Sequence, residues 1–335
     1  MQHNSVATHP RSYPLISLPV GVWLTTLLMA LAVLPVTSSA MGLMIDPSSA
    51  NCGVTSREVT PPLAAAQRLA GSTVSPGQKN IAWAWLGSPT ARYPHTALGS
   101  RFHAGSLHVL LAGKSSVGTS SAPVEVVYRL PIHRVFEDLQ VRLVDLDEDG
   151  RDEMVVIESD ALRGASVVVL GLSGPPDAQT LTELARSPFA GSTFRWLNPV
   201  GFADFDGDGK LDIAAVITPH IGGELTLYHY RPPLLVPYAK AMDTSNHLMG
   251  APEQQLSAVL LKAGKRATVI VPDMSLKALH ALRWEGAAAN GKFKELAEVV
   301  ALPARIERIV PLADAPDAAC LLLADKSWRR VTLLN

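Results

Sequence analysis

Short apolar runs separated by turn residues dominate the chain from Ile81 onward. Most runs are four to six residues long and rich in Val, Leu and Ile. Long stretches with the three- and four-residue spacing of an amphipathic helix are scarce. Short runs of β-branched and aliphatic residues between Gly, Pro, Asn and Asp clusters are typical of β-strands. The pattern therefore predicts an all-β domain.

The apolar runs also recur at a regular spacing. Five of them start 47, 59, 55 and 52 residues apart. They are Leu107–Leu111, Met154–Ile157, Ile213–Val216, Thr268–Val271 and Cys320–Leu323. The last four are each followed, 11 to 13 residues from start to start, by a second run. The second runs are Val167–Leu170, Leu225–Tyr228, Leu279–Leu282 and Val331–Leu334. A nearly constant offset inside a longer period indicates a repeat architecture.

The size of the repeat favours a β-propeller. A unit of about 50 residues with several short strands matches one four-stranded blade. Five units are visible, so we predict a propeller of about five blades (range five to seven) over residues 79–335. Asn80–Leu86 has no unit of its own, and we expect it to complete the final blade, because an open end would leave an edge strand unpaired. A pair of β-sandwiches and a β-solenoid are the alternatives, but sandwiches need no such period and solenoid coils are usually shorter.

The first forty residues differ from the rest of the chain. They contain a single lysine, arginine or acidic side chain, and the apolar run Val20–Val36 is followed by small residues at Ser38 and Ala40. This arrangement predicts a secretory signal peptide over 1–40, cleaved after Ala40. The following segment, 41–78, is then a leader or strap. An uncleaved anchor is the alternative, although the run is short for a span of about 20 residues. Cleavage would give a secreted or periplasmic protein without a membrane span.

Two cysteines, Cys52 and Cys320, lie near the two ends of the mature chain. In an oxidising compartment they could form a disulfide, which would join the two ends of the predicted ring. Two free thiols are the alternative, with Cys320 buried in its apolar run.

Two acidic segments, 145–153 and 204–212, share one pattern. Each has carboxylates at positions 1, 3, 5 and 9 and glycine at position 6. The carboxylates are Asp145, Asp147, Asp149 and Glu153 in the first segment and Asp204, Asp206, Asp208 and Asp212 in the second. Without a cation, four carboxylates brought this close would repel one another or take up protons.

This spacing suits calcium, which takes about six to eight oxygen ligands. The glycine permits a sharp turn that brings the position-7 carbonyl, of Arg151 or Lys210, toward the ion. The absence of His and Cys from the segments argues against zinc or copper. An EF-hand is excluded because position 12 is Val156 or Ala215, within apolar runs, instead of glutamate. We therefore predict two Ca²⁺ sites, the alternative being two solvated acidic turns.

The segments VDLDEDGRDEMVVI and ADFDGDGKLDIAAV resemble FG-GAP/VCBS-type repeats. These repeats occur in the β-propeller of integrin α-subunits and in many secreted bacterial proteins. The resemblance implies a propeller with calcium held in loops on one face. It covers about 30 residues in two blades. The corresponding loops of the next two units lack the carboxylates, so we expect no metal there.

Composition and motifs narrow the function. The net charge is −1 and no basic run is present, which argues against a nucleic-acid partner. The sequence contains no phosphate loop, nucleophile elbow or dinucleotide fingerprint, so we predict no catalytic residue. The preferred hypothesis is an exported, non-catalytic calcium-binding module with a protein or carbohydrate ligand. A propeller-fold hydrolase or lyase acting on a polysaccharide or ester is the alternative, and a structural subunit of an envelope assembly is a third possibility.

Overall fold

The computed structural model describes residues 39–40, 42–46, 52, 65, 67–112, 124–297 and 299–334. In this part of the chain almost all regular structure is β-strand, mostly antiparallel, which confirms the predicted all-β class. No helix among these residues is long and apolar enough to cross a membrane. The predicted signal peptide, 1–40, lies outside them except for Ser39–Ala40.

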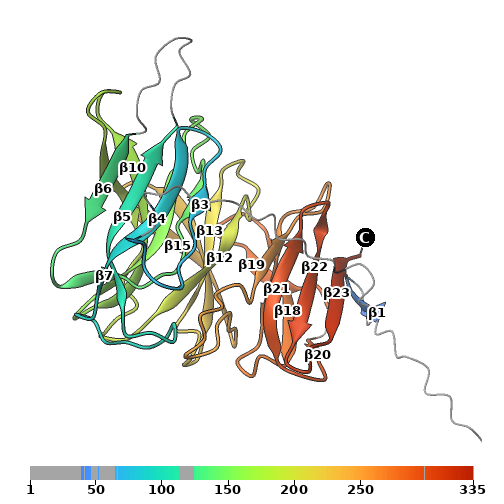
Figure 1. Cartoon of the computed structure of the whole chain (residues 1–335). Coiled ribbons are helices and arrows are strands. Elements are labelled where there is room, and N and C mark those ends of the chain that lie inside the picture. Colours follow the sequence, from blue (N-terminus) through green and yellow to red (C-terminus); the bar gives the residue numbers. More distant parts are fainter. Residues whose placement is uncertain are drawn as a thin grey trace, which may run out of the picture. The chain divides into compact units, whose positions relative to one another are not determined.

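The described strands form one 13-stranded sheet and two five-stranded sheets, which we divide into antiparallel units of four strands in chain order (Figure 1). Unit 1 contains β3 (Ser75–Pro76), β4 (Ile81–Thr90), β5 (His103–Leu111) and β6 (Glu125–Arg129). Unit 2 contains β8 (Arg142–Val144), β9 (Glu153–Asp160), β10 (Gly164–Ser173) and β11 (Thr180–Arg186). Unit 3 contains β12 (Leu197–Ala203), β13 (Asp212–Ile217), β14 (Glu224–Arg231) and β15 (Leu234–Met242). The short strand β7 (Arg134–Phe136) pairs with both β5 and β9 and so links units 1 and 2.

The last two units follow the same order. Unit 4 contains β16 (Ala258–Leu260), β17 (Thr268–Pro272), β18 (Ala278–Glu285) and β19 (Lys292–Glu295), with β20 (Val300–Ala301) also paired to β18. Unit 5 contains β21 (Ile306–Leu312), β22 (Ala315–Leu323) and β23 (Trp328–Leu333). Its fourth strand is β2 (Leu43–Asp46), which pairs with β23 and carries β1 (Ser39–Ala40) on its other side. A disulfide joins Cys52 to Cys320 of β22.

The strand that completes unit 5 is not the expected one. Asn80–Leu86 lies largely in β4, which pairs with β3 and β5 inside unit 1, so its predicted place in the final blade is wrong. The cause is the connection 91–102, which separates β4 from β5 and hides the short offset seen in the other units. Leu107–Leu111 consequently belongs to a third strand, whereas the other four recurring runs lie in second strands. Closure of the units into a ring stays a prediction.

Burial explains the Val-rich runs and positions the acidic segments. All eight residues of β9 are buried, as are nine of the ten residues of β10. Strands packed on both faces need apolar residues at successive positions instead of alternate ones. Glu153 and Asp212 are the first residues of β9 and β13. The last carboxylate of each acidic segment is therefore anchored in the buried part of a strand.

Candidate metal loops

Two equivalent connections carry the acidic segments. Loop I, residues 145–153, connects β8 to β9 in unit 2, and loop II, residues 204–212, connects β12 to β13 in unit 3. Both therefore join the first and second strands of their units. The 59-residue shift between the acidic segments corresponds to one structural unit.

The loops bring the same three positions together. In loop I, Asp145, Asp147 and Glu153 each offer a carboxylate oxygen, and these atoms lie within 4.8 Å of one another. Loop II does the same with its own residues at positions 1, 3 and 9, which are Asp204, Asp206 and Asp212. Carboxylate oxygens converging on one point are the ligands that a hard dication prefers. The donors present therefore fit calcium.

The turns are built alike. Gly150 and Gly209, at position 6, have φ angles of 86° and 80°, a region that favours glycine. Their N–H groups donate to Asp145 Oδ2 and Asp204 Oδ2, at 3.0 Å in both loops. The first carboxylate of each loop is thus held by the backbone of the turn.

The carboxylates at position 5 make the same backbone contact in both loops but differ in whether they join a carboxylate group. The Arg151 N–H donates to Asp149 Oδ1 at 2.8 Å, and the Lys210 N–H donates to Asp208 Oδ1 at 2.9 Å. Asp149 is not in the carboxylate group of loop I, whereas Asp208 joins a second group of loop II. The Arg151 side chain turns away from the acids and donates to the Leu172 carbonyl at 2.9 Å.

The carboxyl groups at position 9 have raised pKa values. Burial raises the pKa of Glu153 to about 7, with the charges of Asp147 and Asp149 adding to the shift. Burial likewise raises the pKa of Asp212 to about 7, again with help from the neighbouring carboxylates. Both shifts have the cause expected when several carboxylates share a poorly solvated space. A bound dication would favour the ionised forms.

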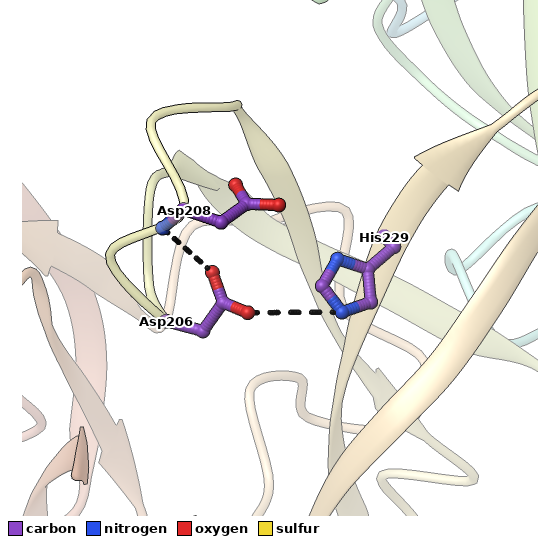
Figure 2. A group of neighbouring side chains, drawn as sticks. All are labelled: Asp206, Asp208 and His229. Carbon is purple, nitrogen blue, oxygen red and sulfur yellow. Dashed lines mark hydrogen bonds and ion pairs between the residues drawn. The ribbon is translucent and has the colours of Figure 1, made fainter. Parts of the chain in front are cut away.

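Loop II has two polar neighbours that its sequence does not contain. His229 of β14 lies beside Asp206 and Asp208 (Figure 2). Its Nε2 is 3.8 Å from Asp206 Oδ2, and its Nδ1 is 3.3 Å from Asp212 Oδ1. The Tyr238 hydroxyl of β15 donates to Asp212 Oδ2 at 2.8 Å, and its ring lies against the His229 ring with centroids 4.1 Å apart. Sequence reasoning missed both residues.

Loop I has apolar neighbours at the same places. Asp212 pairs with His229 across β13 and β14. The ladder between β9 and β10 ends at Met154 and Leu170, so Gly171 is the residue that comes opposite Glu153. A Cβ atom on Gly171 would lie 2.4 Å from Leu184 Cδ1. Leu184 therefore fills the space that an imidazole occupies beside loop II.

A cavity of about 430 Å³ lies between the two loops. Loop I contributes Asp147 and Glu148 to its wall, and unit 3 contributes Lys210 and Arg231. Arg231 also pairs with Asp208, with Nη2 3.1 Å from Oδ2. The remaining lining residues are Leu146, Gly209, Leu211, Tyr230 and Pro232. The cavity thus combines acidic and basic side chains.

Connections at the other end of the units are linked by hydrogen bonds and are here together called the loop face: residues 91–102, 130–133, 161–163, 187–196, 218–223 and 243–257. Turn 161–163 follows β9, and turn 218–223 follows β13. The Ala161 N–H donates to the His133 carbonyl, and the Phe194 N–H donates to the Tyr93 hydroxyl. A further bond runs from the Gly250 N–H to the Ala97 carbonyl. Exposed large apolar side chains on these connections are Phe102, Ile132, Leu162, Phe194, Ile221 and Met249.

A second cavity, of about 320 Å³, lies where several units meet. The Thr73 N–H, just before β3, donates to the Leu139 carbonyl, and the Leu139 N–H donates to Gln254 Oε1. The titratable side chains among its lining residues are Glu253 and Arg308, which form an ion pair with each other.

Comparison with known families agrees with the geometry. A family model described as an FG-GAP-like repeat matches residues 145–215. The matched region begins at the first carboxylate of loop I, includes loop II and ends within β13. No curated protein matches the chain. The repeat is therefore the part of the chain that carries both loops, and the chain is an FG-GAP repeat-containing protein.

Proposed function

We propose that this protein is an exported, calcium-stabilised β-propeller that serves as a non-catalytic binding module. The observation that carries the proposal is the pair of loops in the FG-GAP-like repeat, each with three carboxylates directed at one point. Calcium would bind there, at one end of β9 and β13. A partner would bind at the other end, on the loop face.

The calcium sites would use the whole ladder of each loop. In loop I the ligands would be Asp145, Asp147, Asp149, Glu153 and the Arg151 carbonyl. In loop II they would be the corresponding residues, with the carbonyl of Lys210 at position 7. A ligand that binds only the folded state raises stability by mass action. Calcium would therefore stabilise units 2 and 3 without taking part in recognition.

The propeller ring is supported by the way the units meet. Thr73, Leu139 and Gln254 lie just before the first strands of units 1, 2 and 4, and hydrogen bonds connect them. Unit 5 joins this network because the Ile309 N–H of β21 donates to the Gln255 carbonyl. First strands that converge are expected around the axis of a propeller.

The loop face is the surface best suited to a partner protein. Ile132 and Leu162 are 82% and 80% exposed, and clustered exposed apolar side chains are typical of protein-binding sites. Arg101 is an exposed base beside them, whereas His133 and Arg163 already pair with the buried Asp160. We infer that the partner is a protein with an apolar surface.

If the protein were a hydrolase or a lyase, titratable side chains without an ion-pair partner would be expected in the cavity where the units meet. In the second cavity Glu253 and Arg308 pair with each other instead. This pairing favours the binding module.

Calorimetry with and without calcium tests the first half of the proposal. Two ions at about 100 times their Kd would add about 5 kcal/mol to the free energy of unfolding, and the melting temperature should rise by roughly 10 °C or more. The Asp147→Asn/Asp206→Asn double variant should lose most of this rise. An unchanged melting temperature of the wild-type protein on adding calcium would refute the calcium sites.

Cross-linking in the native envelope fraction tests the second half. Ile132→Asp/Leu162→Asp places acids on the loop face and should abolish recovery of the partner. Leu234→Asp is the control, because Leu234 is also an exposed leucine, at 57%, but lies on β15. Equal recovery with all three proteins would mean that the loop face is not the binding surface.

A further inference from the structure

We propose that His229, Asp206 and Asp208 form a site for a first-row transition dication, such as Zn²⁺, beside loop II. The proposal goes beyond the calcium module described above, because it assigns a different metal and a ligand outside the repeat match. Figure 2 shows the three side chains, which come from loop II and from the neighbouring strand β14. One ligand atom from each lies within 4.8 Å of the others.

The arrangement of His229 is that of a supported metal ligand. Its Nε2 faces Asp206, with 3.8 Å between Nε2 and Oδ2. This separation is longer than a hydrogen bond and leaves room for an ion between the two atoms. Its Nδ1 faces Asp212, with 3.3 Å between Nδ1 and Oδ1. Metal-bound histidines usually direct the second ring nitrogen at a carboxylate, which fixes the ring and its tautomer.

Among the buried polar atoms of the described residues that make no hydrogen bond, two face each other beside the proposed site. Asp212 is 1% exposed, yet its Oδ1 accepts no hydrogen bond, and His229 Nδ1 makes none either. Buried polar atoms without partners are costly. A metal ion on Nε2 would fix the imidazole with its Nδ1–H directed at Asp212 Oδ1. The same ion would therefore satisfy both atoms.

Further contacts hold the carboxylates in place. The Tyr238 hydroxyl donates to Asp212 Oδ2 at 2.8 Å, so this oxygen is held while Oδ1 of the same carboxylate faces His229. The Asp208 N–H donates to Asp206 Oδ1 at 3.1 Å, which leaves Asp206 Oδ2 directed at the imidazole. Arg231 pairs with Asp208 Oδ2 at 3.1 Å. Tyr238 is thus a positioning residue that acts through Asp212.

The donor set selects the class of metal. Calcium prefers oxygen ligands alone, whereas an imidazole with carboxylates suits zinc and neighbouring transition ions. Asp206 and Asp208 are also calcium ligands in the function proposed above, so calcium and zinc would compete for loop II.

Loop I supplies the contrast within the same chain. A break in the strand ladder leaves Leu184 unpaired between Glu183 and Ala185, and the corresponding break in unit 3 leaves Tyr238 unpaired between Pro237 and Ala239. Leu184 and Gly171 therefore stand where Tyr238 and His229 stand beside loop II. Loop I has no imidazole, and we assign it no transition metal.

Zinc titration of the untagged full-length protein, followed by calorimetry and by the visible spectrum of a Co²⁺-substituted sample, tests the site. The wild-type protein should bind one zinc ion at this site, and His229→Ala should weaken that binding by at least about 100-fold. Tyr238→Phe should keep one ion but bind it up to about 10-fold more weakly, because Tyr238 holds Asp212, which in turn orients the metal-bound His229. His133→Ala removes a solvent-exposed imidazole on the loop face and should leave zinc binding unchanged.

The outcomes separate this proposal from the calcium sites. Asp149→Asn in loop I should leave zinc binding unchanged, whereas Asp208→Asn in loop II should weaken it. Equal zinc affinity in the wild-type protein and His229→Ala would overturn the site, whatever calcium does. If His229→Ala fails to fold, His229→Gln keeps a polar side chain at this position and serves the same comparison. Loss of the calcium-induced rise in melting temperature, with intact zinc binding, would refute the calcium proposal alone.

Discussion

Loop I and loop II have the same spacing of acids and glycine but different surroundings. Each places its first, third and ninth residues at one point. Beside loop I the next two strands contribute Gly171 and Leu184, and beside loop II they contribute His229 and Tyr238. We infer that the loop itself would supply the ligands of a cation. The strands behind it would then determine which kind of cation binds and how rigidly its ligands are held.

The difference also extends to the ninth residue. Glu153 accepts the Leu146 N–H at 2.8 Å and has no side-chain donor of the kind that Tyr238 provides to Asp212. A glutamate reaches further from its strand than an aspartate does. The ninth carboxylate of loop I is thus held by its own loop, while that of loop II contacts side chains of β14 and β15.

The largest expected effect is on calcium binding, when the position-3 carboxylate of one loop or the other is removed in two single variants. Asp147→Asn and Asp206→Asn should each remove one of two calcium ions. Each should lower the free energy of unfolding in calcium by about 3 kcal/mol at 100 times Kd. Isothermal titration gives the stoichiometry, and chemical denaturation gives the stability.

In the presence of a chelator the same substitutions should raise the free energy of unfolding instead of lowering it. Without calcium, removing one carboxylate relieves repulsion, and the relief should be larger at Asp206, which exposes 4% of its side chain, than at the exposed Asp147. If either substitution abolished both ions, the loops would be one coupled site and the comparison between them would fail.

Much of the fold was predictable because the apolar runs of the sequence recur at a regular spacing. The all-β class and the second strands of units 2 to 5 follow from periodicity and burial alone. The completion of unit 5 was not predictable in this way. Leu43–Asp46 is four residues long and adjoins the predicted signal peptide, and only its pairing with β23 shows its role. Connection 91–102 likewise hid the order of strands in unit 1.

The carboxylates of the candidate sites were predictable because they lie within nine residues of one another. His229 and Tyr238 were not, because they reach loop II from other strands. The shift between equivalent residues falls from 59 at the loops to 58 between Gly171 and His229 and to 54 between Leu184 and Tyr238. A fixed shift of 59 aligns His229 with Leu170. Hairpin lengths differ between the units, so the sequence repeat loses register before it reaches these residues.

The smallest effect, and the sharpest test of the comparison, is to give loop I the surroundings of loop II. Gly171→His alone should destabilise the protein by about 1–3 kcal/mol through overpacking, because a side chain at Gly171 meets Leu184. Gly171→His/Leu184→Tyr replaces that leucine with the residue that stands against the imidazole in unit 3. The double variant should recover part of the lost stability and bind a second zinc ion.

Native mass spectrometry measures how many zinc ions each variant binds. The control is Leu184→Tyr, which lacks the added imidazole. A folded double variant that still binds one zinc ion would contradict the idea that β10 and β11 decide the metal. The longer Glu153 would then be the difference that matters, since it cannot hold a neighbouring imidazole as Asp212 does. Glu153→Asp in the same background would separate these explanations, because only the second predicts that shortening this side chain adds the ion.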